Sequence, residues 1–408
     1  MPDYKAILTG QSWNATPTLS GPQKPVFLTY AFPSPAIFSW MDEEGFTGAD
    51  RQAARKALKM WGDASGITFL EVSGQDAEIR FLWKEADDSV SAWAEFPNLQ
   101  PTGAGLVRDA DGGEVNLNSF YRETINANAP FKLYLLLHEI GHALGLKHPF
   151  HTSPHNTQLL GEDLDHVSHT VMAYDGGDPS MAGITLGELD RQAIHALYGT
   201  SSKDGQEVAK WGWDGKRQVL SQTGNSRSDT ILGVAVKDLM QGKKGNDKLY
   251  GFEGADTLAG GVGNDVLAGG AGADQFKFDT TLSPRKNIDR ILDFDNGFDH
   301  DRIALSHKIF KGLAKGHLPV RAFALEGATT DVYDDRDDWA DWNDWDAWYN
   351  DPDAPRPVLP VSEATRIIFN EKTRYVSYDP DGSGPAARIQ FAKLSGYAIL
   401  DASDFFIV

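Results

Sequence analysis

The chain has 408 residues, of which 41% are hydrophobic and 24% are charged, with a formal net charge of −20 at pH 7 and no cysteine. A chain of this length is expected to fold as two domains, and its acidic balance argues against nucleic acid as a partner. No run approaches the roughly 20 apolar residues of a transmembrane helix, so we expect no membrane insertion. The lack of cysteine excludes disulfides, thiolate metal sites and cysteine nucleophiles.

The first half of the chain mixes predicted strands and helices. Residues 47–65 carry an apolar stripe at helical spacing, and residues 184–198 are expected to form a closing helix. Short runs rich in β-branched and aromatic residues predict strands over residues 28–32, 67–72, 77–83 and 114–118, the last at a sheet edge. This order predicts an α/β domain, a mixed sheet with long helices, over residues 1–205.

The strongest chemical motif lies within residues 131–148. After the apolar run FKLYLLL the chain reads HEIGHALGLKH, which has the HExxHxxGxxH spacing of the metzincin zinc signature. His138 and His142 are four residues apart, so a helix would place both rings on one face. Two imidazoles on one face can meet a single ion at about 2.0–2.1 Å.

The remaining residues of the motif complete a catalytic metal site. Glu139 can reach a metal-bound water without being a ligand. Gly145 is expected to end the helix, since glycine adopts a positive φ at no steric cost. The turn can then bring His148 round as third ligand and leave one position open. The alternative is a buried helix with histidines nearby, but the added glycine and third histidine favour one catalytic Zn2+.

From Gly224 the sequence repeats every nine residues, with two degenerate copies followed by four good ones that begin at Gly242. This nonapeptide is the calcium-binding repeat of the RTX parallel β-roll. Two nonapeptides make one coil, so Asp247 should stack near Asp265, and Asp256 near Asp274. The alternative, a flexible Gly/Asp linker, does not explain an apolar residue at every eighth place of the repeat.

Glycine-rich turns direct carbonyls at a cation, and aspartate supplies a hard oxygen suited to calcium. We therefore expect several structural Ca2+ ions. The predicted calcium ligands are Gly242, Lys244, Asn246, Asp247, Gly251, Glu253, Ala255, Asp256, Gly260, Val262, Asn264, Asp265, Gly269, Ala271, Ala273 and Asp274. The fold class predicted for residues 206–408 is an all-β parallel β-roll joined to a β-sandwich.

An acidic, tryptophan-rich segment interrupts the second domain at residues 331–360, where Trp339, Trp342, Trp345 and Trp348 recur every three residues. One interpretation is a surface insertion that packs its tryptophans on the roll. The other is a site for a partner, a glycan or extra cations. Both interpretations remain open at this point.

Together these motifs resemble the serralysins, secreted bacterial zinc endopeptidases in which a metzincin domain precedes an RTX β-roll. The resemblance extends from Ser12-Trp13-Asn14 to the hydrophobic C-terminus, and it includes Thr170-Val171-Met172-Ala173-Tyr174 as the Met-turn. It implies that Met172 forms an apolar floor beneath the histidines. It also implies that Tyr174 ligates zinc at rest and hydrogen-bonds the transition state.

The resemblance also implies protein substrates and a type I ABC exporter that reads the C-terminus. The first twenty residues lack the basic start and apolar core of a secretory signal peptide, so we expect an extracellular protein that is exported without one. Millimolar calcium outside the cell would then fold the roll. The protein is expected to be a monomer, and an extended substrate could pair with the strand over residues 114–118.

Two features differ from the serralysin pattern. The recognisable family start lies within the first fifteen residues, where a pro-segment would be expected to precede it, and the acidic tryptophan segment is additional. The alternative function is a catalytically inert RTX binding or adhesion protein. An intact set of His138, His142, His148, Glu139 and Tyr174 favours the enzyme. The histidines at 151, 155, 166 and 169 are expected to be surface residues.

Overall fold

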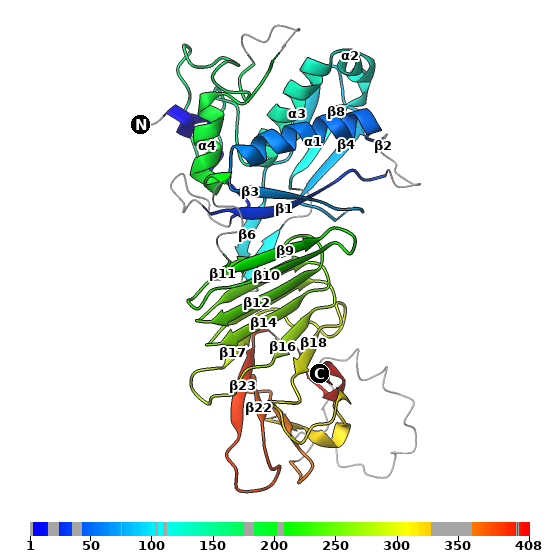
Figure 1. Cartoon of the computed structure of the whole chain (residues 1–408), viewed down its shortest axis with the longest axis vertical. Coiled ribbons are helices and arrows are strands. Elements are labelled where there is room, and N and C mark those ends of the chain that lie inside the picture. The colour runs from blue at the N-terminus through cyan, green and yellow to red at the C-terminus, as the bar shows by residue number, and fades with distance from the viewer. Residues whose placement is uncertain are drawn as a thin grey trace.

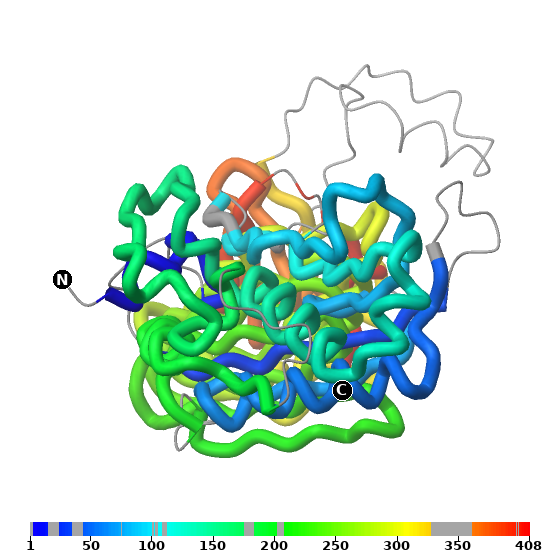
Figure 2. The backbone as a smooth tube through the Cα atoms, turned by 90° about the horizontal axis from the view of Figure 1, so that it is seen from above, coloured from blue at the N-terminus to red at the C-terminus, as the bar shows by residue number. Residues whose placement is uncertain are grey.

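The structure is a computed structural model that describes residues 3–14, 24–34, 43–74, 76–102, 105–108, 112–174, 183–201, 208–327, 361–396, 398 and 400–408. The acidic tryptophan segment, residues 331–360, falls outside them. In Figure 1 an upper α/β part stands above a long stack of strands. Figure 2 looks along the long axis, and there the helices of the upper part overlie the strands of the roll.

The upper part is built on a six-stranded sheet in the order β3-β1-β4-β8-β5, with β2 paired to β4. Strands β1, β3, β4 and β8 run parallel, whereas β2 and β5 are antiparallel to their neighbours. The strands are β1 (Val26–Ala31), β2 (Glu43–Gly45), β3 (Ile67–Glu71), β4 (Ile79–Lys84), β5 (Ala92–Ala94) and β8 (Glu114–Asn118).

Helices cover the upper face of this sheet (Figure 1). They are η1 (Asp3–Ile7), α1 (Gly48–Asp63), η2 (Ser119–Tyr121), α2 (Arg122–Ala127), α3 (Ala129–Ala143) and α4 (Glu188–Tyr198). Helix α1 starts where Thr47 and Asp50 form a capping box, and its apolar stripe ends in the fully buried Trp61. Trp61 donates to the Leu137 carbonyl at 3.1 Å, so α1 and α3 share one core.

The prediction that residues 114–118 lie at a sheet edge is wrong. Strand β8 lies between β4 and β5, and β5 (Ala92–Ala94) takes the edge position. Residues Val115 to Asn118 are buried, as expected of a strand flanked on both sides. Strand β5 is only three residues long, and so short a run carries no readable alternation.

The nonapeptide repeats form the predicted parallel roll. Two eight-stranded sheets face each other, in the orders β19-β24-β18-β16-β14-β12-β10-β9 and β11-β13-β15-β17-β23-β22-β21-β20. Alternate nonapeptides supply alternate sheets. The strands of the roll are β9 (Lys210–Asp214), β10 (Val219–Thr223), β11 (Thr230–Leu232), β12 (Asp238–Lys244), β13 (Lys248–Glu253), β14 (Thr257–Val262), β15 (Val266–Ala271), β16 (Gln275–Phe278), β17 (Asp289–Ile291) and β18 (Arg302–Leu305).

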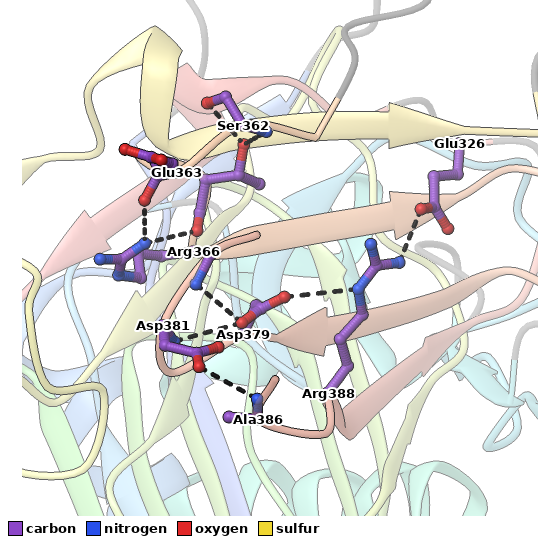
Figure 3. A network of polar contacts seen from close by, with 10 residues as sticks. Glu326, Ser362, Glu363, Arg366, Asp379, Asp381, Ala386 and Arg388 are labelled. Atoms are coloured by element: carbon purple, nitrogen blue, oxygen red, sulfur yellow. Dashed lines mark hydrogen bonds and ion pairs between the residues drawn. The ribbon is translucent and has the colours of Figure 1, made fainter. Parts of the chain in front are cut away.

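The C-terminal strands continue both sheets around the same core. The remaining elements are β19 (Gly316–His317), η4 (Val320–Ala322), β20 (Phe323–Glu326), β21 (Ile367–Asn370), β22 (Tyr375–Tyr378), β23 (Ile389–Leu394), η5 (Ala402–Asp404) and β24 (Phe405–Ile407). The loop after β22 is closed by Asp379, which accepts from the Gly382 amide at 2.9 Å and lies 3.4 Å from the Arg388 guanidinium. Figure 3 shows Arg388 reaching Glu326 as well.

A hairpin joins the two parts. Strands β6 (Leu99–Thr102) and β7 (Gly105–Arg108) pair with each other and form a two-stranded sheet separate from the upper sheet. Leu99 and Leu106 pack against Tyr250 and Phe252 of the roll. The upper α/β part is therefore in apolar contact with the roll.

Candidate metal centre

Helix α3 presents two histidines from a rigid position. The Asn128 side chain caps its start by accepting from the Phe131 amide at 3.1 Å. Every residue from Lys132 to Ala143 is buried, so packing fixes the direction in which His138 and His142 point. These two rings are only 2% and 6% exposed.

The chain turns sharply after α3. Gly145 has a φ of +100°, and a Cβ at this position would lie 2.3 Å from the Gln11 carbonyl oxygen. Only glycine fits both the conformation and the space. The turn brings His148 back to the helix, as predicted from the sequence.

The three imidazoles point at one place. The Nε2 atom of His148 lies 3.0 Å from Nε2 of His138 and 3.0 Å from Nε2 of His142. His138 Nδ1 lies 2.7 Å from the Val171 carbonyl, and His142 Nδ1 lies 2.8 Å from the Leu146 carbonyl. A carbonyl only accepts, so each Nδ1 carries the proton and each Nε2 presents a lone pair.

Converging lone pairs cannot hydrogen-bond to one another, whereas they fit a cation. Burial, the larger cause, and the charge of a neighbouring histidine together lower the pKa of His138, His142 and His148 to about 3. The three rings are therefore in the neutral form that binds metal. Three nitrogens on one ion, each second ring nitrogen held by an acceptor, are the donor set of a catalytic zinc site. Among the described residues this is the group of three that could hold a metal through histidine or carboxylate ligands.

Glu139 lies beside this centre without joining it. The side chain is 4% exposed, and its Oε2 atom has no hydrogen-bond partner among the described residues. Burial raises the pKa of Glu139 to about 8. A buried carboxylate without a partner is costly unless a water, a substrate or an ion completes it. Its properties are those of a proton acceptor.

Two residues of the segment after Thr170, Met172 and Tyr174, contact the metal centre. A Cβ on Gly141 would lie 2.6 Å from Met172 Sδ, so this fully buried sulfur packs directly beneath α3. Tyr174 Oη lies 2.8 Å from His148 Nε2, and the ring is 60% exposed. Met172 thus lies beneath α3 and Tyr174 beside His148, while their roles stay predictions.

One buried carboxylate at this centre was missed in the sequence. Asp190 of α4 accepts from the Thr170 hydroxyl at 2.6 Å and from the Val171 amide at 2.8 Å. The carbonyl of that same Val171 accepts from His138. Asp190 thus orients the acceptor that fixes the first histidine. Its signal in the sequence was only an acidic residue in the first turn of a helix.

Aromatic neighbours of the histidines were also missed. Phe150 stacks on His148 with ring centroids 5.2 Å apart, and Phe96, which follows β5, meets His142 edge-on at 5.5 Å. His151 is exposed, as expected, and its Nδ1 also lies 3.0 Å from His148 Nδ1. These contacts depend on loop geometry that no spacing rule encodes.

The aspartates of the repeats form two ladders, as the eighteen-residue coil predicts. In each step the backbone amide of one aspartate donates to Oδ1 of the aspartate one coil further on. One ladder runs through Asp229, Asp247, Asp265 and Asp289, and the other through Asp238, Asp256, Asp274 and Asp301. The last members were missed because their spacings are 24 and 27 residues instead of 18.

The ladder carboxylates fit calcium. Asp247, Asp256, Asp265 and Asp274 are each 1% exposed, and the Oδ2 atom of each has no hydrogen-bond partner among the described residues. A Cβ on the facing glycine of each repeat would lie 2.0–2.4 Å from this Oδ2, so glycine leaves the space open. Buried, unpaired carboxylate oxygens beside backbone carbonyls are hard ligands for Ca2+.

The other predicted calcium ligands lie on the strands of the roll and in the turns between them. Gly242 and Lys244 lie on β12, Gly251 and Glu253 on β13, Gly260 and Val262 on β14, and Gly269 and Ala271 on β15; Asn246, Ala255, Asn264 and Ala273 lie in the turns that follow. The Ala255 carbonyl accepts from the Lys237 ammonium. The Lys237 ammonium therefore already uses one lone pair of the Ala255 carbonyl oxygen.

Without calcium the roll should be more stable at low pH. Burial, then neighbouring Asp238, raises the pKa of Asp256 to about 9, and burial raises that of Asp274 to about 8. Unfolded aspartate has a pKa of about 3.9, so this stabilisation is complete below about pH 4 and is lost as pH rises through 8 to 9. In calcium-depleted protein we expect circular dichroism to show more strand signal from the roll at pH 5 than at pH 8; the opposite order would contradict the burial of these carboxylates.

Comparison with known proteins agrees with these sites. Residues 42–199 match the matrixin family model, and residues 223–251, 232–267 and 250–277 match the model of the RTX calcium-binding nonapeptide repeat. The metallopeptidase AprA of Pseudomonas marginalis is 30% identical over 229 residues, which are 49% of this chain and 46% of that protein. Serralysin B of Dickeya chrysanthemi is 29% identical over 214 residues, 45% of this chain and 40% of the relative.

Serralysin A of Dickeya chrysanthemi is 28% identical over 242 residues, which are 53% of this chain and 47% of that protein. The matched regions thus span less than half of the length of these relatives. Within the part of the chain that the structure describes, no helix has both the length and the apolar character needed to cross a membrane.

Proposed function

We propose that this chain, which carries a matrixin-type metalloprotease domain followed by RTX calcium-binding repeats, is a secreted zinc endopeptidase acting on proteins. The observation that carries the proposal is the convergence of three imidazole Nε2 atoms beside the buried Glu139. We assign the protease to residues 1–205 and the calcium-folded domain to residues 206–408.

His138, His142 and His148 would hold one zinc ion, with Tyr174 as the neighbouring fourth group. Zinc supplies a Lewis acid that polarises the scissile carbonyl and lowers the pKa of water to about 7. Glu139 accepts the proton of the attacking water and returns it to the leaving amine. Its burial strengthens it as a base, because the charged form lacks solvation.

Tyr174 supports the developing negative charge. Burial raises the pKa of the Tyr174 hydroxyl, and the negative charge of Glu139 raises it further. The hydroxyl therefore stays protonated and can donate a hydrogen bond. The exposed ring has room to turn from His148 towards the carbonyl oxygen of a substrate.

Replacing Tyr174 with phenylalanine should lower kcat by about 10²–10³-fold, the usual loss for one donor to an oxyanion. KM should change little, because the hydroxyl acts on the transition state more than on the bound substrate. Steady-state kinetics on a peptide substrate with zinc content measured in parallel tests this expectation. An unchanged kcat in the zinc-loaded variant would remove Tyr174 from the mechanism.

The substrate would bind along β5 instead of the strand over residues 114–118. Among the described residues, β5 is the last strand of the sheet on that side, and Phe96, two residues after β5, packs against His142. An extended peptide can add to such an edge through backbone hydrogen bonds, which suits proteins of varied sequence.

Calcium and export follow from the second half of the chain. Where calcium is scarce, the buried ladder carboxyl groups must be protonated or lose their hydration, and both oppose folding at neutral pH. We therefore propose that the chain passes a type I ABC exporter unfolded and folds outside the cell as calcium binds. The similarity to serralysins and the RTX repeats support this route. We propose a monomer with one Zn2+ and several Ca2+ ions.

A casein assay tests the activity itself. The purified protein, loaded with zinc and calcium, should release peptides; removing zinc with a chelator that leaves calcium bound should stop the release, and adding zinc should restore it. A zinc-loaded protein that cleaves no casein or peptide library would overturn the enzymatic proposal and favour an RTX binding protein.

A further inference from the structure

We propose that the first residues of the chain and Lys147 position the third zinc ligand, His148. We call residues 3–9 the N-terminal strap. The proposal rests on the zinc site proposed above and adds the group of contacts that holds its most exposed ligand in place.

Lys147 is a buried lysine beside His148. Only 2% of its surface is exposed, and its ammonium donates to the carbonyls of Ala6, His151 at 2.6 Å and Gln158 at 2.9 Å. A buried ammonium needs all three of its donors satisfied, and here three backbone carbonyls supply the acceptors. Ala6 belongs to the strap, whereas His151 and Gln158 lie in the loop that follows His148. Lys147 therefore joins the N-terminal strap to the loop that follows the third ligand.

The backbone of the strap follows the turn that leads to His148. The Lys147 amide donates to the Ile7 carbonyl at 2.8 Å, and the Thr9 amide donates to the Gly145 carbonyl at 2.9 Å. Leu8 and Leu146 form an antiparallel bridge between them. The strap thus supplies a donor for the Gly145 carbonyl and an acceptor for the Lys147 amide, on both sides of Leu146 in the turn after α3.

A second loop holds the strap from its other side. The Asn156 side chain is 3% exposed and donates to the carbonyls of Lys5 at 2.6 Å and Leu8 at 2.7 Å. The Ser153 hydroxyl donates to the Thr9 carbonyl at 2.7 Å. The strap is therefore clamped between the turn at Gly145–Lys147 and the loop over residues 153–158.

This clamp matters most for the third ligand. His138 and His142 are fixed by a buried helix and by backbone carbonyls. His148 has neither, since its Nδ1 meets the side chain of His151 and it follows the helix by several residues. Its position depends on the backbone of residues 145–147, which the strap holds. Loosening the strap should release His148 from the metal while the other two ligands stay in place.

The test is the rate of zinc release into an excess of a colorimetric chelator, measured on the full chain. Lys147→Met keeps the length of the side chain but removes its donors, and Asn156→Ala frees the strap without changing a charge. Each should release zinc about 10–100-fold faster, the usual effect of removing a group that orients a metal ligand. Lys59→Met, at an exposed lysine paired with Asp63 on α1, should release zinc at the unmodified rate.

Cobalt substitution reports the ligands directly. The visible spectrum of the cobalt-loaded variants should shift as one nitrogen ligand is lost, whereas loss of stability alone would leave the bands in place. Folded variants with an unchanged release rate and spectrum would overturn the positioning role of Lys147 and the strap.

Hydrogen exchange on the unmodified protein supplies a measurement that needs no variant. Zinc loading should slow hydrogen exchange at the Thr9 and Lys147 amides, because the contacts that hold the strap also hold His148. Equal exchange with and without zinc would contradict the coupling. An unmodified protein that binds no zinc would instead overturn the proposed function, so the two failures are distinguishable.

Discussion

Replacing Glu139 with glutamine is expected to lower kcat/KM for casein or a peptide substrate by about 10²–10⁴-fold, the range contributed by a positioned general base. Glutamine has nearly the same shape but cannot accept the proton of the attacking water. The three histidines are unchanged, so zinc should remain bound. The reason lies in the structure: Glu139 is buried beside the metal ligands, with one carboxylate oxygen unpaired.

Glu188→Gln is a matched control for this substitution. Glu188 lies at the start of α4 and is exposed, where it accepts from Gln192 at 3.0 Å. This variant should keep full activity. A Glu139→Gln protein that binds zinc and retains full activity would show that another group takes the proton.

Removing calcium is expected to unfold the roll while it leaves the upper α/β part with its helices. The Oδ2 atoms of Asp247, Asp256, Asp265 and Asp274 are buried and have no hydrogen-bond partner in the described residues, so without calcium their burial opposes folding. Each site filled at 100 times its Kd adds about 2.7 kcal/mol to stability, and several such sites exceed the usual margin of a domain. Circular dichroism at neutral pH should show loss of strand signal in chelator and its return with calcium.

Magnesium is the control for ionic strength and charge. It requires a small octahedral site and gives up water reluctantly, so an equal concentration should not fold the roll. A strand signal that is the same in chelator, magnesium and calcium would contradict the role assigned to the ladders. The contact of Leu106 with the roll predicts a secondary effect, a lower Tm of the upper part when the roll is unfolded.

The sequence predicts those parts of this protein in which chemistry requires a fixed spacing. His138, His142, Gly145 and His148 come together because helix periodicity and one tight turn leave few alternatives. The repeats behave in the same way, since each coil places an aspartate directly beside the previous one. Both patterns are local, so no long-range information is needed to read them.

Other features depend on contacts between distant segments. The edge strand at Ala92–Ala94 is recognised only from its pairing with β8. Asp190 acts at the centre through Val171, and Lys147 through Ala6, which is far away in the sequence. Asp289 and Asp301 complete the ladders after irregular spacings. In each case a single polar residue acquires its role from a backbone group that another element brings close.

We propose that one metal ion held by His138, His142 and His148 drives peptide hydrolysis. The most direct test of this proposal titrates zinc into metal-free, calcium-loaded protein and measures bound zinc and casein hydrolysis in the same samples. We predict that activity rises in proportion to bound zinc and stops rising at one zinc per chain, and that His142→Ala neither holds this zinc nor gains activity. Full activity without zinc, or equal activity in His142→Ala, would contradict the account.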